Sequence, residues 1–153
     1  MVGVRLRLAA LALFAVAVIS TSCGSGSSTT LDEYFPRVAT LAATFDNAST
    51  TPSANGTFAP NEASLRTFAS GLDLLAVPSE AKQAHHDLTV ASKNLADLQH
   101  SILTGNNAPS TKEAALVRDW QAACHRLQDV ALARKMDVDL RCASALHIVD
   151  SGG

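Results

Sequence analysis

The sequence predicts an all-α protein: an antiparallel four-helix bundle whose C-terminal tail is stapled by a disulfide bond. Four consecutive segments repeat apolar residues at steps of three and four, which places those side chains on one helix face. No segment shows the sustained alternation that is typical of a strand. Short polar connections join the segments, as an antiparallel bundle requires.

The first predicted helix begins at Leu31, where Thr30 and Glu33 form a capping box. Pro36 removes a backbone hydrogen bond and strains the preceding turn, so we expect a kink or a later start. Residues 47–60 are turn formers and small polar residues, which predicts a flexible connection. The apolar face of this helix comprises Leu31, Tyr34, Phe35, Val38, Leu41 and Phe45.

The second predicted helix ends before Pro78, and the third begins at Pro78 to Glu80 and stops at Gly105. Ser110 and Glu113 open the fourth with another capping box. The predicted apolar stripes are Leu65, Phe68, Leu72 and Leu75 in the second helix, Ala81, Ala84, Leu88, Ala91, Leu95, Leu98 and Ile102 in the third, and Leu116, Trp120, Ala123, Leu127 and Val130 in the fourth.

Cys124 and Cys142 predict the disulfide. The helix from Cys124 to Met136 is about 18 Å long, and the six residues onward to Cys142 span about 20 Å if extended. Because the lengths match, the chain can leave the helix and double back along it. Alternation along such a tail places Val138 and Leu140 inward and Asp137, Asp139 and Arg141 outward.

The first 22 residues predict a secretory signal. Arg5 and Arg7 precede an apolar run over residues 8–19, which is shorter than the roughly 20 residues that a membrane span needs. Small residues then lead into Cys23, an order that resembles a bacterial lipoprotein signal, in which this cysteine becomes the lipid-carrying first residue. The alternative is ordinary cleavage near the same point, which releases a soluble protein with a free Cys23.

The cysteine count favours lipidation. Three cysteines in an exported chain leave one thiol without an explanation. A lipid on Cys23 resolves the odd number and leaves Cys124 and Cys142 to pair outside the reducing cytosol.

The signal, the Gly-Ser-Gly that follows Cys23 and the alanine-rich helical body are together similar to small lipoproteins that actinobacteria export. The segment Trp120-x-x-x-Cys124, followed by Val138-Asp139-Leu140-x-Cys142, resembles the ending of uncharacterised envelope proteins of this kind. The resemblance implies a protein attached by its N-terminal lipid to the extracytoplasmic face of the cell membrane, and it implies no activity. The expected organisation is a signal over 1–22, a flexible tether over 23–30, a bundle domain over 31–147 and a tail over 148–153.

Composition excludes some classes of partner. Removal of Arg5 and Arg7 with the signal leaves 10 basic and 14 acidic residues, a formal charge of −4. This balance opposes nucleic-acid binding, which needs a basic surface, and it offers no polybasic patch for anionic lipid. No nucleophile elbow, zinc-protease motif, phosphate loop or haem-attachment motif is present, so we do not expect an enzyme or a cofactor.

The histidines do not predict a metal site. His85 and His86 project about 100° apart on a helix and cannot chelate one ion well together. Asp97 and His100 share a helix face, but that face is polar and includes Lys93.

Two functions remain open from the sequence. The first is a non-enzymatic binding or structural module of the cell envelope that has a protein partner. The alternative is a small-molecule or metal carrier that uses the bundle interior, with His85 as one weak candidate for a ligand contact. An enclosed cavity of several hundred Å³ would favour the carrier, and a solid core with an exposed apolar patch would favour a protein partner.

Overall fold

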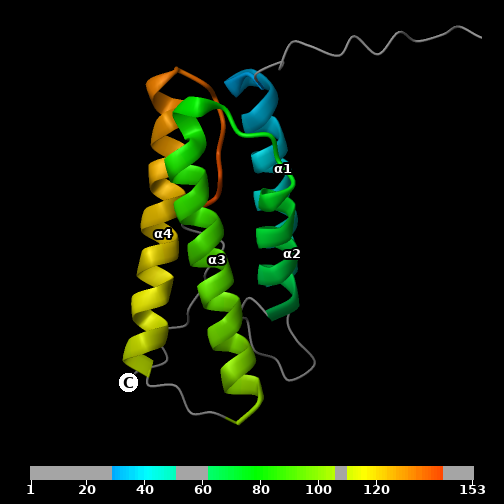
Figure 1. The fold of residues 1–153 in the computed structure, drawn as a ribbon, viewed down its shortest axis with the longest axis vertical. Helices are drawn as coiled ribbons and strands as arrows, with labels where there is room; N and C mark the ends of the chain where they lie inside the picture. Colours follow the sequence, from blue (N-terminus) through cyan, green and yellow to red (C-terminus); the bar gives the residue numbers. More distant parts are fainter. Residues whose placement is uncertain (1–28, 51–61, 106–109, 143–153) are drawn as a thin grey trace, which may run out of the picture.

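The computed structural model describes residues 29–50, 62–105 and 110–142. Within these residues the chain is helical and contains no strand, which confirms the predicted fold class. The helices run alternately down and up as an antiparallel bundle (Figure 1). Their bounds are α1 Leu31–Thr50, α2 Glu62–Asp73, α3 Lys82–Leu103 and α4 Ser110–Ala133, and a short 3₁₀ turn, η1 Ser79–Ala81, precedes α3.

The predicted domain bounds fall partly outside the described residues. These omit the predicted signal, residues 23–28 of the tether and everything beyond residue 142. Helix α1 runs to Thr50, so the connection predicted to begin at residue 47 starts later than expected. The rest of that connection, residues 51–60, also lies outside the described part.

The start of α1 matches the predicted capping box. The Glu33 amide donates to Thr30 Oγ1 at 3.3 Å, and the Thr30 amide donates to Glu33 Oε2 at 3.2 Å. The helix therefore begins at Leu31 and continues through Pro36, so the predicted later start is wrong. Proline deprives the Asp32 carbonyl of its usual donor, but burial of the apolar face of α1 holds the helix together on both sides.

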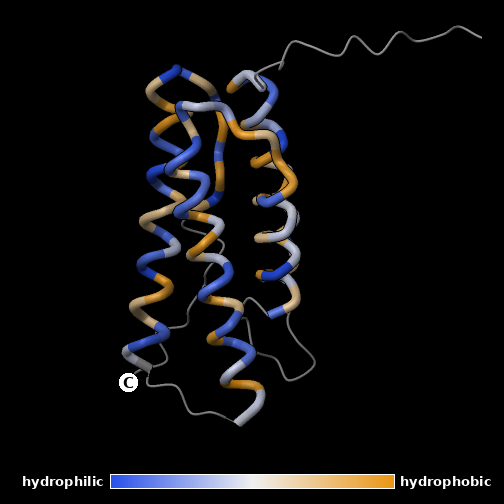
Figure 2. The backbone as a smooth tube through the Cα atoms, in the orientation of Figure 1, coloured by the Kyte–Doolittle hydropathy of each residue, from blue (hydrophilic) through white to orange (hydrophobic). Residues whose placement is uncertain are grey.

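Apolar residues recur along each helix and supply one shared core (Figure 2). Phe45, Phe68 and Trp120 form an aromatic cluster with ring centroids 5.0 to 6.3 Å apart. The Trp120 indole N–H donates to Ser92 Oγ at 2.9 Å, and the Ser92 hydroxyl donates to the Leu88 carbonyl at 2.8 Å. The indole therefore packs inside the bundle with its polar atom satisfied.

One position of the predicted stripes is exposed. Ile102 is 38% exposed, because it lies in the last turn of α3 at the end of the bundle. Leu75, Leu116 and Val130 are half-buried against the core, and Leu75 lies beyond the end of α2.

The tail doubles back as predicted. Lys135 adopts a left-handed conformation (φ 57°), and the Met136 amide donates to the Ala131 carbonyl at 3.0 Å. Residues 136–141 then return alongside α4 on the side that faces α1 (Figure 1). The disulfide joins Cys124 to Cys142, with Cα atoms 5.6 Å apart.

The predicted alternation along the tail is confirmed. Leu140 is buried and Val138 is half-buried, whereas Asp137, Asp139 and Arg141 are exposed. The tail therefore adds an extended segment to the bundle that covers part of α4 with apolar side chains.

Candidate functional site

The residues predicted to carry function lie in different places. Cys23 is outside the described residues, so its lipidation stays a prediction. Cys124 and Cys142 are both buried, with exposed fractions of 2% and 5%, and their disulfide links the tail to α4. Because an attacking thiolate has little access to either sulfur, the bond is suited to holding structure.

His85 lies inside the bundle. Its Nδ1 atom is 2.9 Å from the Tyr34 hydroxyl, and the two ring centroids are 5.9 Å apart. Burial lowers the pKa of His85 below its ordinary value. Burial also raises the pKa of Tyr34 above its ordinary range.

Both groups are therefore neutral near pH 7. The hydrogen bond between Nδ1 of His85 and the Tyr34 hydroxyl is available to both neutral tautomers of the imidazole, since the hydroxyl can donate to a bare Nδ1 or accept from a protonated one. This partner gives His85 a structural role, and its contact with a ligand stays a prediction.

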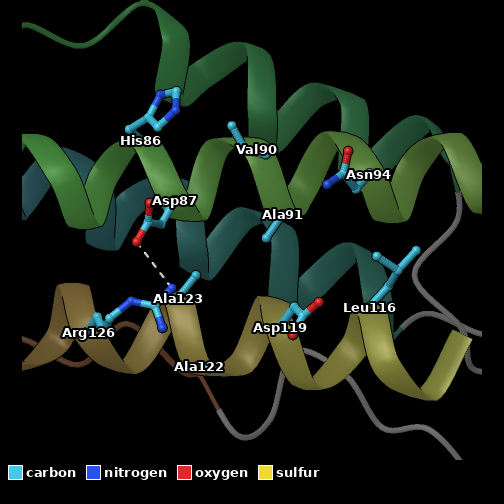
Figure 3. A pocket seen from close by; sticks show the side chains of 10 residues that line it. All are labelled: His86, Asp87, Val90, Ala91, Asn94, Leu116, Asp119, Ala122, Ala123 and Arg126. Carbon is cyan, nitrogen blue, oxygen red and sulfur yellow. Dashed lines mark ion pairs between the residues drawn. The ribbon is translucent and has the colours of Figure 1, made fainter. Parts of the chain in front are cut away.

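The neighbouring His86 faces a groove between α3 and α4, which Figure 3 shows from close by. The groove has a volume of about 330 Å³. Its lining comprises His86, Asp87, Val90, Ala91 and Asn94 from α3, and Leu116, Asp119, Ala122, Ala123 and Arg126 from α4.

Small side chains explain why the groove exists at this place. Ala91 and Ala123 are nearly fully buried between the two helices, and Ala122 stands beside them on the exposed side of α4. Alanine fills little of the space between two helix backbones, so a hollow remains between the polar side chains at its rim. In the sequence Ala91 and Ala123 read only as part of the predicted bundle seam, and Ala122 lay outside the predicted stripes, so sequence reasoning missed the groove.

A second hollow extends the groove toward the far end of α3. It has a volume of about 260 Å³ and shares Asn94 and Leu116 with the first. Ser101 and Lys112 also line it. From His86 to Ser101 the combined groove spans about 22 Å of helix, a length that suits a segment of polypeptide.

Charges divide the groove into a paired part and an open part. Asp87 and Arg126 point toward one another across it, with Oδ2 and Nη2 3.2 Å apart (Figure 3). Asp119 forms no ion pair with another described residue. The open carboxylate and the nearby Asn94 amide therefore offer polar contacts beside the apolar floor.

The predicted polar face of α3 is occupied by ion pairs. Asp97 Oδ1 lies 3.0 Å from Arg66 Nη2, and His100 Nδ1 lies 2.9 Å from Glu62 Oε2. Arg66 also pairs with Glu62 at 2.7 Å, so this network connects α2 to α3. The hydrogen bonds to Arg66 and His100 lower the pKa of the half-buried Glu62.

The described ranges contain no group of three histidine, cysteine or acidic side chains that could hold a metal ion. In the same part of the chain, no helix is long and apolar enough to cross a bilayer.

Sequence reasoning also missed a residue that positions the tail. Gln128 of α4 donates through Nε2 to the Val138 carbonyl, and its Oε1 accepts from the Leu140 amide at 2.8 Å. One side chain thus satisfies two backbone groups of the tail, much as a neighbouring strand would. A polar residue four positions after Cys124, and so on the same helix face as that cysteine, was the available signal, but it does not specify the partner.

Comparison with protein-family models, with curated proteins and with solved structures found no match to this chain.

Proposed function

We propose that this protein is a non-enzymatic binding module of the cell envelope, anchored by a lipid on Cys23 at the extracytoplasmic face of the membrane. The observation that carries the proposal is the Cys124–Cys142 disulfide. Such bonds form and persist in oxidising compartments. The bond also pairs two of the three cysteines and leaves Cys23 for the lipid that its signal-like context indicates.

The bundle interior supports a binding module more than a carrier. Large side chains fill the space between the helices, among them Trp120, Tyr34, Phe35, Leu65 and Leu127, all of which are nearly or fully buried. The hollow between α3 and α4, in contrast, is a surface groove with an apolar floor and a charged rim. Interfaces between proteins have this composition, so we assign the α3–α4 groove as the partner-binding surface.

The test is affinity capture of the lipidated protein from native membranes, with mass spectrometry of bound proteins and small molecules. Ala122→Lys places a long charged side chain in the groove, and Ala114→Lys makes the same change at an exposed position of α4 outside the lining. We expect a protein partner that binds the natural chain and Ala114→Lys but not Ala122→Lys.

Two results would contradict this assignment. A partner that is retained equally by both variants would place the interface elsewhere. A reproducible small ligand without any protein partner would favour the carrier instead.

A further inference from the structure

A small pocket lies between α1 and α2, and it shares no residue with the α3–α4 groove. Its volume is about 150 Å³. The lining comprises Leu41, Thr44, Phe45 and Ala48 from α1, and Ser64, Thr67 and Phe68 from α2.

The packing of the two helices explains the pocket. At one end, Gly71 of α2 lies so close to Leu41 of α1 that an added Cβ would be 2.6 Å from the leucine Cδ2. Toward the other end, the small residues Ala48 and Ser64 line the space between the helices. The rings of Phe45 and Phe68 also border the pocket, stacked with centroids 5.0 Å apart and planes 26° apart.

Both threonine hydroxyl groups in the lining are already engaged. Thr44 donates to the Thr40 carbonyl at 2.9 Å, and Thr67 donates to the Ala63 carbonyl at 2.8 Å. Ser64 also interacts with another group of the protein. The threonines therefore contribute mainly their methyl groups to the pocket, and no charged residue lines it.

This chemistry selects an apolar ligand. A sugar, carboxylate or phosphate would give up hydrogen bonds with water and find few replacements in the pocket. The volume is well below the several hundred Å³ that drug-sized ligands occupy. The pocket is open at the surface, where Thr44, Ala48 and Thr67 are exposed, and its volume matches that of an apolar cavity that holds one molecule the size of benzene.

We propose that the α1–α2 pocket binds a single apolar ring carried by a small molecule, packed against Phe45 and Phe68. This site goes beyond the proposed function, since it requires neither the lipid anchor nor the partner groove.

Toluene is a suitable probe, titrated by NMR into the purified full chain carrying Cys23→Ala, so that no protein-bound lipid competes. Thr67→Leu adds bulk to the pocket. Thr40→Leu is the matched control, because Thr40 is also exposed and also donates to a carbonyl four residues earlier, at 2.9 Å, but lies outside the lining.

We expect saturable shifts of the Phe45 and Phe68 signals. Thr67→Leu should weaken toluene binding by about tenfold or more, equivalent to at least about 1.4 kcal/mol, and Thr40→Leu should leave it unchanged. If Thr67→Leu does not fold, Ala48→Leu fills the same pocket from α1, with the exposed Ala63→Leu as its control.

The proposal is overturned if the natural chain shows no saturable binding, or if the filling and control variants bind toluene equally well. Ala122→Lys should keep its affinity for toluene, so failure of this site and failure of the partner groove can be told apart.

Discussion

Asp46 is a buried side chain of α1 that pairs with the tail. The residue is 7% exposed, its Oδ2 accepts from Arg141 Nη1 at 2.7 Å, and its Oδ1 atom has no hydrogen-bond partner within residues 29–50, 62–105 and 110–142. Arg141 therefore supplies the positive charge that compensates a carboxylate inside the bundle.

Arg141→Met should lower the free energy of unfolding by about 1 to 3 kcal/mol, because it leaves a buried carboxylate unpaired. This loss in the free energy of unfolding is smaller than for a fully buried ion pair, because the Arg141 side chain is 43% exposed and solvent screens its charge. Urea denaturation measures the change. An equal loss in an Asp46→Asn background would show that the ion pair is not its source.

The buried pair of His85 and Tyr34 predicts a dependence of stability on pH. Burial lowers the pKa of His85 in the folded protein, partly opposed by the charge of Asp73, and the neighbouring His86 lowers it further. The unfolded chain therefore binds a proton at a higher pH than the folded chain. The contribution of neutral His85 to the stability of the folded protein is complete above the ordinary histidine pKa of about 6.5. This contribution is lost as the pH falls from that value through the lowered pKa of His85 in the folded protein.

His85→Gln should flatten this decline, since it keeps a hydrogen-bonding group for Tyr34 but does not titrate. Denaturation midpoints measured between roughly pH 5 and 7 test the prediction. The exposed His125→Gln serves as control and should keep the slope of the natural protein. If the denaturation midpoint of His85→Gln still declines with falling pH as in the natural protein, His85 is excluded as the origin of the pH dependence.

At the level of the elements, the tail acts as a fifth segment of the bundle. The disulfide fixes the end of the tail at Cys142, and the Leu140 side chain enters the core. The Gln128 side chain of α4 binds the tail backbone at Val138 and Leu140. Loss of the bond should release these contacts together, because they all depend on the tail lying against α4.

The double variant Cys124→Ser and Cys142→Ser should be less stable by about 3 kcal/mol, the value expected for a loop of this length. Thermal or urea unfolding, compared with the natural chain under oxidising conditions, gives the difference. Unchanged stability would mean that packing of Leu140 and the bonds of Gln128 hold the tail without the cross-link.

Local patterns were sufficient to predict the elements. The three-four spacing identified the helices, Thr30 and Glu33 located the start of α1, and the lengths on either side of Met136 predicted the returning tail. The later start predicted at Pro36 was wrong because burial of the surrounding helix face outweighs one lost hydrogen bond.

The candidate site could not be predicted in the same way. A groove depends on how far two helices stand apart, and alanine is compatible with close packing and with a hollow alike. The roles of Gln128 and Asp46 depend on partners 10 or more positions away in the sequence, which no local pattern specifies. His85 and His86 are adjacent in sequence, and only the rotation of α3 places one in the core and the other at the groove.

At the scale of the whole molecule, a disulfide-linked helical bundle with an open groove joins the proposed N-terminal anchor. The bundle and the disulfide are features of the structure. The anchor at Cys23, the extracytoplasmic location and the partner are proposals that these features support.

Intact mass spectrometry of the native protein extracted from membranes examines the lipid anchor and the disulfide in one experiment. We predict a chain that begins at Cys23, carries a covalent lipid there and lacks the two hydrogen atoms of the Cys124 and Cys142 thiols. A chain that retains its first 22 residues, or one that begins near Cys23 with no lipid and is recovered in the soluble fraction, would contradict the account.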